Sequence, residues 1–254
     1  MAELRLTYLY PYHMNLYGDT GNIICLKKRC EERSIQIKIT PIHPGDQVKE
    51  GSTDLYFFGG GQDDQQLHIA QHLESLKQVI NFDINNGVSA LCICGGYQLF
   101  GKFFKTKDGK VLKGIEIFNC ETYGSNHRMI GNSIVKINEA LYSSISNIYP
   151  QAPKTLVGFE NHSGETRLID VDSLGNNICG YGNNYTDRRE GCVFKNAIGT
   201  YLHGALLPKN PHLADYLIVQ ALKNRYKESF NLTTLDDFIA LNAHNQIIRR
   251  FSPN

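Results

Sequence analysis

The chain has 254 residues, enough for one large α/β domain whose core needs no disulfide or metal ion. Its 26 Lys and Arg balance 25 Asp and Glu, and neither sign dominates a long block, which argues against the clustered positive charge of a nucleic-acid-binding protein. No uncharged apolar run approaches the ~20 residues of a membrane span, and the N-terminus lacks the order of a signal peptide. Seven cysteines without framework spacing are typical of reduced thiols, so we expect a protein of the cytoplasm.

Strands and helices alternate over the first hundred residues. Runs rich in β-branched and aromatic residues predict strands at 4–10, 34–39, 54–58 and 88–94. Apolar residues at helical spacing predict helices between them, at 21–33 and 62–81. This alternation is typical of a parallel sheet with helices on both faces.

The remainder of the chain changes in character. Residues 110–200 are strand-rich, with Asn and Gly turns, and amphipathic helices return at 211–225 and 235–249. The sequence contains no internal repeat, low-complexity tract or obvious linker. We therefore predict a single domain over residues 1–254, in which the helical C-terminus is an accessory layer.

The segment LCICGGYQLFG at 91–101 has the pattern of a nucleophile at a sharp turn from strand to helix. Such a turn needs small neighbours because its backbone is strained, and Gly95 and Gly96 follow Cys94 directly. The helix N-terminus favours the thiolate, and the N–H of Gly95 would point at a developing oxyanion. Cys92 projects to the same face but lies within the predicted strand, so we expect it in the core. Both thiols also fit the common role of a small buried hydrophobic residue.

The glycine run 59–61 follows a predicted strand that should neighbour the strand of Cys94. Open α/β sheets bind ligands at this carboxyl edge. A glycine loop there can add a second backbone donor to an oxyanion hole, which is worth about 10²–10³-fold in rate. The alternative is an ordinary turn at the end of a strand.

A nucleophilic thiolate needs a general base, which is usually a histidine. His68 and His72 lie four residues apart on a predicted helix without a third ligand, so an exposed helix face is favoured over a metal site. His162 and His203 each stand at a strand end beside glycine. His203 follows the stronger strand, AIGTYL, and is the predicted base.

Four elements together resemble the class I glutamine amidotransferases of the cobyric acid synthase-like branch. These are FFGGGQD at 57–63, CGGYQLFG at 94–101, GFENHSG at 158–164 and GTYLHG at 199–204. The resemblance implies a three-layer αβα, flavodoxin-like fold with a mainly parallel sheet. It places the catalytic core at about 4–205 and a helical C-terminal extension at about 206–254.

Within this branch the chain resembles the family of glutaminase subunits (GatD) of lipid II isoglutaminyl synthase. The likeness rests on the length of a free-standing subunit, on LYPYHMNLYGDTGN at 9–22 and on RMIGN at 128–132. In that family the glutaminase forms a heterodimer with a Mur-ligase-like subunit of the MurT type. The pair amidates the D-glutamate of the peptidoglycan stem peptide. The resemblance implies L-glutamine as substrate and no cofactor in this subunit, with ATP and Mg in the partner.

The resemblance also implies roles for individual residues. Cys94 would be the nucleophile and His203 the base. Arg128 would bind the α-carboxylate of glutamine through a bidentate fork. The remaining substrate contacts would come from Gly60, Gly95 and Gln98, the two glycines as oxyanion donors.

One position departs from the family pattern. Many class I amidotransferases carry a carboxylate two residues after the catalytic histidine, where this chain has Ala205. Either Cys94 and His203 act as a dyad, or a carboxylate arrives from elsewhere, with the partner subunit as one source.

Three other functions are compatible with parts of the sequence. Amidation of a corrinoid precursor uses the same chemistry, but such enzymes usually carry a fused ATP-binding domain, and the chain has no P-loop. A non-catalytic assembly module is disfavoured by the intact Cys94 and His203. A cysteine peptidase or a DJ-1-like hydrolase is disfavoured by Arg128.

Overall fold

The first sheet of the computed structural model, which describes residues 2–251, has six strands. In spatial order they are β11 (Cys192–Phe194), β12 (Ala197–Thr200), β4 (Ser89–Ile93), β3 (Leu55–Phe58), β1 (Glu3–Leu9) and β2 (Gln36–Ile42). All neighbouring pairs are parallel except β11 with β12. The carboxyl ends of β3, β4 and β12 therefore meet at one edge of the sheet.

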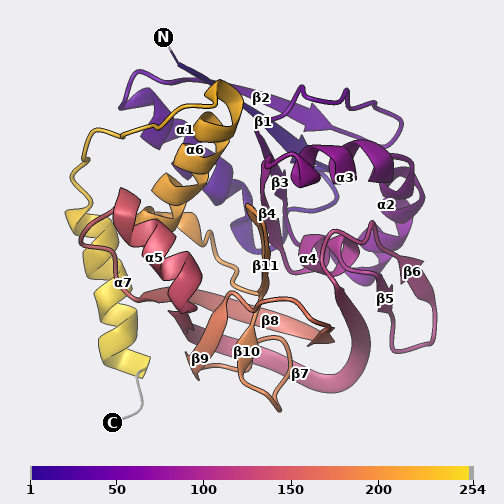
Figure 1. Cartoon of the computed structure of the whole chain (residues 1–254). Helices are drawn as coiled ribbons and strands as arrows, with labels where there is room; N and C mark the ends of the chain where they lie inside the picture. Colours follow the sequence, from indigo (N-terminus) through magenta and orange to yellow (C-terminus); the bar gives the residue numbers. More distant parts are fainter. Residues whose placement is uncertain (1, 252–254) are drawn as a thin grey trace.

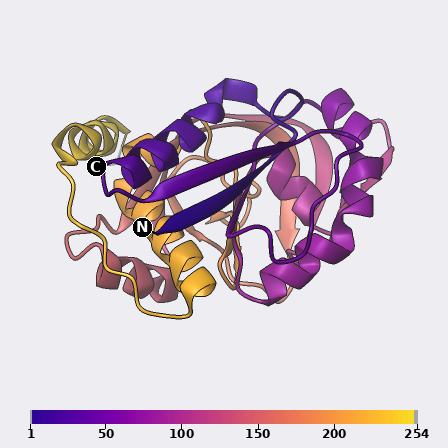
Figure 2. The ribbon, with the colours of Figure 1, turned by 90° about the horizontal axis from the view of Figure 1, so that it is seen from above.

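Helices cover both faces of this sheet (Figures 1 and 2). α1 (Thr20–Glu31) and α6 (Pro211–Tyr226) pack on one face, and α2 (Asp63–Ser75), α3 (Lys77–Asn85) and α4 (Gly95–Phe100) on the other. Because both faces are covered, every residue of β3 and of β4 is buried. The predicted αβα fold with a mainly parallel sheet is confirmed.

The strand-rich middle of the chain forms a second sheet, below the first in Figure 1. Its strands are β5 (Phe103–Lys105), β6 (Val111–Lys113), β7 (Cys120–Ile137), β8 (Thr155–Leu168), β9 (Gly175–Cys179) and β10 (Arg189–Glu190). The long strands β7 and β8 pair antiparallel, with a register shift between Gly124 and Met129. The sequence predicted a strand-rich segment at 110–200 but not the separation of these strands from the first sheet.

Residues 207–251 pack against both sheets. η2 (Leu207–Lys209) leads into α6, and α7 (Phe238–Phe251) lies against β7 and β8, while α5 (Glu139–Ile148) packs on α6. The buried guanidinium of Arg29 forms ion pairs with Asp215 on α6 and with Asp237 just before α7. Asp215 also pairs with Arg33. These buried charges fix the irregular segment between α6 and α7 to α1.

Two boundaries differ from the prediction for physical reasons. The helix predicted at 62–81 is broken at Leu76, whose N–H bonds to Leu73 O three residues back; the apolar spacing continues because Leu76 is itself buried. The strand predicted at 34–39 extends as β2 through Pro41. Proline is tolerated there because β2 is an edge strand.

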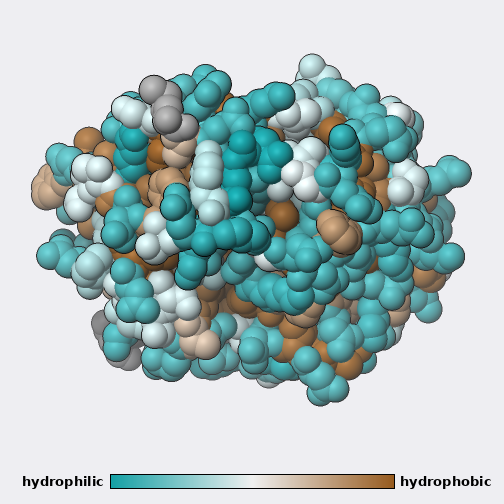
Figure 3. All heavy atoms as spheres, turned by 45° about the horizontal axis from the view of Figure 1, so that its top comes forward, coloured by the Kyte–Doolittle hydropathy of each residue, from teal (hydrophilic) through white to brown (hydrophobic). Residues whose placement is uncertain are grey.

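The surface seen in Figure 3 is mainly hydrophilic, with apolar side chains scattered over it. None of the helices in the described part of the chain combines the length and the apolar character that crossing a bilayer requires.

Candidate active site

Cys94 lies at a strained turn between β4 and α4. Its φ of 48° and ψ of −104° belong to a region that side-chain-bearing residues rarely adopt. A Cβ on Gly95 would come within 2.9 Å of Gln66 Nε2, and one on Gly96 within 2.5 Å of Phe58 O. The two glycines are therefore required by close packing around the turn.

The two neighbouring cysteines have different surroundings. Cys94 is 7% exposed and lines a pocket of about 290 Å³. Cys92 lies inside β4 without exposed surface, and burial raises the pKa of its thiol. Cys92 belongs to the core, as its position within the strand predicted.

His203 follows β12 at the same sheet edge and is fully buried. A Cβ built on Gly60 would lie 2.5 Å from His203 Cε1 and 3.4 Å from Cys94 Cβ, so the imidazole and the cysteine flank one small space. His203 Nδ1 is 3.4 Å from Oδ1 of Asp19, whose carboxylate is also fully buried.

The charge state of His203 follows from these neighbours. Burial lowers the pKa of the imidazole, but the Cys94 thiolate and the Asp19 carboxylate outweigh burial and raise the pKa to about 10. The raised pKa favours the protonated imidazole of His203, which is the partner that a cysteine nucleophile uses.

The prediction for Gly60 requires a correction. Its N–H, expected to face the substrate oxyanion, donates to Asp19 Oδ2 at 2.7 Å. The next glycine, Gly61, lines the pocket beside Cys94, and a Cβ on Gly95 would come within 3.0 Å of Gly61 N. Gly61 and Gly95 are therefore the backbone amides that the glycine loop and α4 bring together next to the thiol.

Arg128 and Gln98 line the same pocket as Cys94. Arg128 lies on the exposed part of β7, and its Nε donates to Asn161 Oδ1 at 2.6 Å. Gln98 is buried on α4, where it accepts from Gln66 Nε2 and donates to the Tyr201 hydroxyl. Arg128 is thus directed by a neighbour from β8, whereas the Gln98 amide is engaged in a buried network.

His162, the histidine that the sequence ranked second, also lines the pocket. Its ring stacks on Tyr201 at a centroid distance of 3.6 Å, and Nδ1 lies 2.9 Å from Gly164 O. Burial lowers the pKa of His162, although Glu160 opposes the shift. A neutral, stacked ring is suited to shaping the pocket wall, while His203 holds the place beside Cys94.

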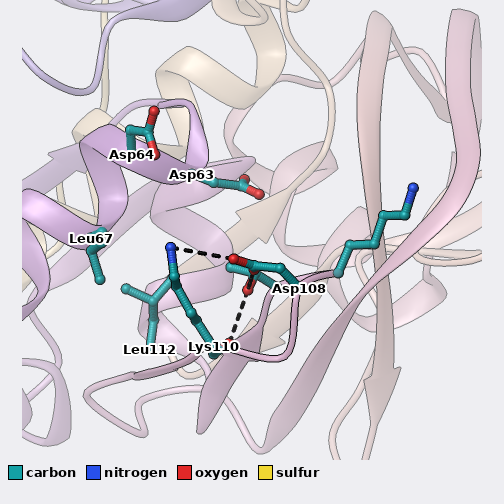
Figure 4. Close-up of a pocket in the computed structure, with 8 residues that line it drawn as sticks. Asp63, Asp64, Leu67, Asp108, Lys110 and Leu112 are labelled. Carbon is teal, nitrogen blue, oxygen red and sulfur yellow. Dashed lines mark hydrogen bonds and ion pairs between the residues drawn. The ribbon is translucent and has the colours of Figure 1, made fainter.

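A second hollow, of about 360 Å³, lies between the start of α2 and the β5–β6 hairpin (Figure 4). Asp63 lines both this hollow and the pocket of Cys94. Burial, with Asp64 and Asp108 nearby, raises the pKa of Asp63. No cysteine or histidine is among the described residues that line this second hollow, whereas Cys94 and His162 line the other pocket.

Comparison with known proteins agrees with this geometry. Residues 5–211 match the model of the CobB/CobQ-like glutamine amidotransferase domain. The chain belongs to this family.

Two relatives extend along nearly the whole chain. It is 36% identical to the lipid II isoglutaminyl synthase (glutamine-hydrolyzing) subunit GatD of Staphylococcus aureus, over 89% of this chain and 87% of that one. It is 35% identical to the GatD subunit of Streptococcus pneumoniae, over 94% of this chain and 88% of that one. Among solved structures, the glutaminase domain of Trypanosoma brucei CTPS with bound acivicin shares the fold: the TM-score is 0.55 at 12% identity, covering 91% of this chain and 98% of that one.

Three residues of the site were not predicted from the sequence: Gly61 and Asn161, which line the pocket, and Asp19, which lies behind it against His203. Asp19 was assigned no catalytic role, Gly61 was not distinguished from Gly60, and Asn161 lies inside the GFENHSG element without a distinguishing pattern. The carboxylate in the GDTGN segment was the available signal for Asp19.

Proposed function

We propose that the chain is the glutaminase subunit of a lipid II isoglutaminyl synthase, which hydrolyses L-glutamine to glutamate and ammonia. Cys94, at its strained turn, and His203 both lie next to the small space above Gly60. This arrangement is the observation that carries the proposal. The likeness to two GatD subunits over nearly their full length supports the identity of the complex.

Substrate binding is assigned to the pocket of Cys94. The exposed guanidinium of Arg128 binds the α-carboxylate of glutamine, which places the side-chain amide above the thiol. Gln98 forms part of the pocket wall and orients the substrate through the network that it shares with Gln66 and Tyr201.

The reaction then proceeds in two steps. Cys94 Sγ attacks the amide carbon, and the N–H groups of Gly61 and Gly95 stabilise the tetrahedral oxyanion. His203 protonates the leaving nitrogen, so ammonia departs and a glutamyl thioester remains. His203 next takes a proton from water, whose oxygen attacks the thioester. The C–S bond breaks, glutamate leaves with its second proton released to solvent, and the Cys94 thiolate beside the protonated His203 is restored.

The ammonia is used by a second subunit. A Mur-ligase-like protein of the MurT type, which binds ATP and Mg, forms a heterodimer with this chain and amidates the D-glutamate of lipid II. The ammonia has to pass between the subunits by a protected route, because water at neutral pH would protonate it.

The test is Cys94→Ala in the complex with the Mur-ligase-like subunit. We expect amidation of lipid II with glutamine to be lost and amidation with added ammonium salts to persist. Loss of both activities would assign Cys94 a structural role and contradict the proposal. Covalent labelling of Cys94 by diazo-oxo-norleucine in the wild type, and not in Cys94→Ala, distinguishes a glutaminase from a non-catalytic assembly module.

A further inference from the structure

We propose that Asp19 is the positioning carboxylate of His203, so that this chain supplies the third member of its own catalytic set. This inference rests on the glutaminase function proposed above. It concerns the carboxylate that is missing at Ala205, two residues after His203, and identifies a carboxylate of this chain that lies against the imidazole.

The first argument is the geometry of the two carboxylate oxygens. Oδ1 lies 3.4 Å from His203 Nδ1, and Oδ2 accepts the N–H of Gly60 at 2.7 Å. Both Asp19 and His203 are fully buried, and a buried carboxylate is stable only when paired and hydrogen-bonded. Since Nδ1 faces Asp19, Nε2 is the ring nitrogen left for the thiol of Cys94.

The second argument is the packing of Ala205, which explains why the carboxylate does not come from its usual position. Ala205 has a φ of 48°, and a Cβ on Gly21 would come within 2.6 Å of Ala205 Cβ. The start of α1 therefore fills the space beyond Ala205, and a longer side chain there would collide with it. Asp19, two residues before Gly21, brings a carboxylate to His203 from this same helix start.

The link to Gly60 gives Asp19 a second task. One carboxylate holds both the imidazole and the glycine loop, and the next residue of that loop, Gly61, lies beside Cys94. Asp19 thus sets the orientation of the base and, through Gly60, the position of an oxyanion donor. Without such a group, nothing in a Cys–His dyad would fix the orientation of the imidazole or the position of the oxyanion donor.

The variant that tests this is Asp19→Asn, in the full chain alone and together with the Mur-ligase-like subunit. Asparagine can still accept from Gly60, but its NH₂ group opposes the N–H of His203 Nδ1 and favours the wrong tautomer. We expect kcat of glutamine hydrolysis to fall about 10²–10⁴-fold, by analogy with the serine-protease triad, while KM changes little.

The pH profile gives a readout that a structural role would not move. Among the groups that the structure describes, those that act on the charge of His203 include Cys94, Asp19 and His162, and the Lys209 ammonium donates to the carbonyl of the next residue, Gly204. Removing the Asp19 charge lowers the pKa of His203, so the alkaline limb of the rate should move to lower pH. An unchanged limb would contradict the proposal.

The matched control is Asp83→Asn. Asp83 is a buried carboxylate on α3 that accepts from the Tyr56 hydroxyl and the Gly51 N–H, and it has no contact with His203 in the described structure. The Asp83→Asn variant should be less stable than the wild type, but the kcat of its folded fraction should be unchanged. If Asp19→Asn keeps kcat within about twofold of the wild type, Asp19 has no positioning role.

A measurement on the wild type covers the case in which Asp19→Asn does not fold. In protein with ¹⁵N-labelled histidine, Nδ1 of His203 should carry a strongly deshielded proton, assigned by its loss in His203→Gln. A His203 without a proton on Nδ1 would overturn the proposal. A wild type that shows this proton but never hydrolyses glutamine would instead contradict the glutaminase function and leave the pairing intact.

Discussion

Phe159 and His203 are hydrogen-bonded to each other through their backbones in both directions: His203 N donates to Phe159 O at 2.7 Å, and Phe159 N to His203 O at 3.3 Å. This bridge joins the loop after β12 to β8 of the second sheet. Two residues beyond Phe159, Asn161 holds Arg128. The base and the substrate-binding arginine therefore depend on the same strand for their placement.

The rate of glutamine hydrolysis should be governed on its alkaline side by His203. The protonated imidazole donates to the leaving ammonia, and the pKa of His203 is raised to about 10 by Cys94 and Asp19 against the effect of burial. We expect kcat/KM to persist above the ordinary histidine range and to fall only as pH rises toward 10. A fall centred near pH 6.5 would show that His203 is not paired in this way.

Gly60→Ala should inactivate the glutaminase without unfolding the protein. The new Cβ would lie 2.5 Å from His203 Cε1, so the imidazole has to move away from Cys94. We expect a loss of about 10²-fold or more in kcat, the size of a disturbed acid–base pair. Amidation with ammonium salts by the complex should persist. Full glutaminase activity would mean that the loop shifts freely and does not position the base.

Arg128→Gln should raise KM for glutamine more than it lowers kcat, because the guanidinium binds a part of the substrate that does not react. A loss of about 2–3 kcal/mol in binding, equivalent to roughly 30–150-fold in KM, is expected for a charge-assisted hydrogen bond. Arg189→Gln is the matched control, since Arg189 is paired with Asp187 on a loop outside the pocket. Equal KM values for the two variants would show that Arg128 does not bind the substrate.

Asp215→Ala should reduce stability strongly. The change leaves the buried Arg29 and Arg33 without a shared partner, and breaking a buried ion pair in this way costs about 3–5 kcal/mol. Urea unfolding monitored by circular dichroism measures the change. Lys27→Ala removes the exposed pair with Glu31 on the same helix and should cost at most about 1 kcal/mol. Similar losses for both variants would contradict this account of the buried cluster.

The parts of the site that lie on continuous segments could be predicted from the sequence. The turn at Cys94 is encoded by a strand followed at once by two glycines, and His203 by a strand end beside glycine. Both patterns depend on neighbours in the chain, so local reasoning was sufficient. The resemblance to a known family added Arg128, whose own surroundings in the sequence are unremarkable.

The parts that depend on distant segments could not be predicted. Asp19 and His203 are separated by 184 positions, and no periodicity links a residue just before α1 to an imidazole just after β12. Gly60 and Gly61 are equivalent in sequence; the carboxylate of Asp19 distinguishes them by taking the first N–H. The second sheet likewise follows from the pairing of β7 with β8, which strand-forming residues alone do not specify.

The position of Pro41 on β2 has a consequence for the association of these molecules. The N–H of Gln36 donates inward to Ala2 O, and because donors alternate along a strand, position 41 faces outward. Proline offers no N–H there, and Lys38 places a charge on the exposed strand. The border of the sheet is therefore a poor template for another chain, which protects a concentrated solution of this protein against edge-to-edge aggregation.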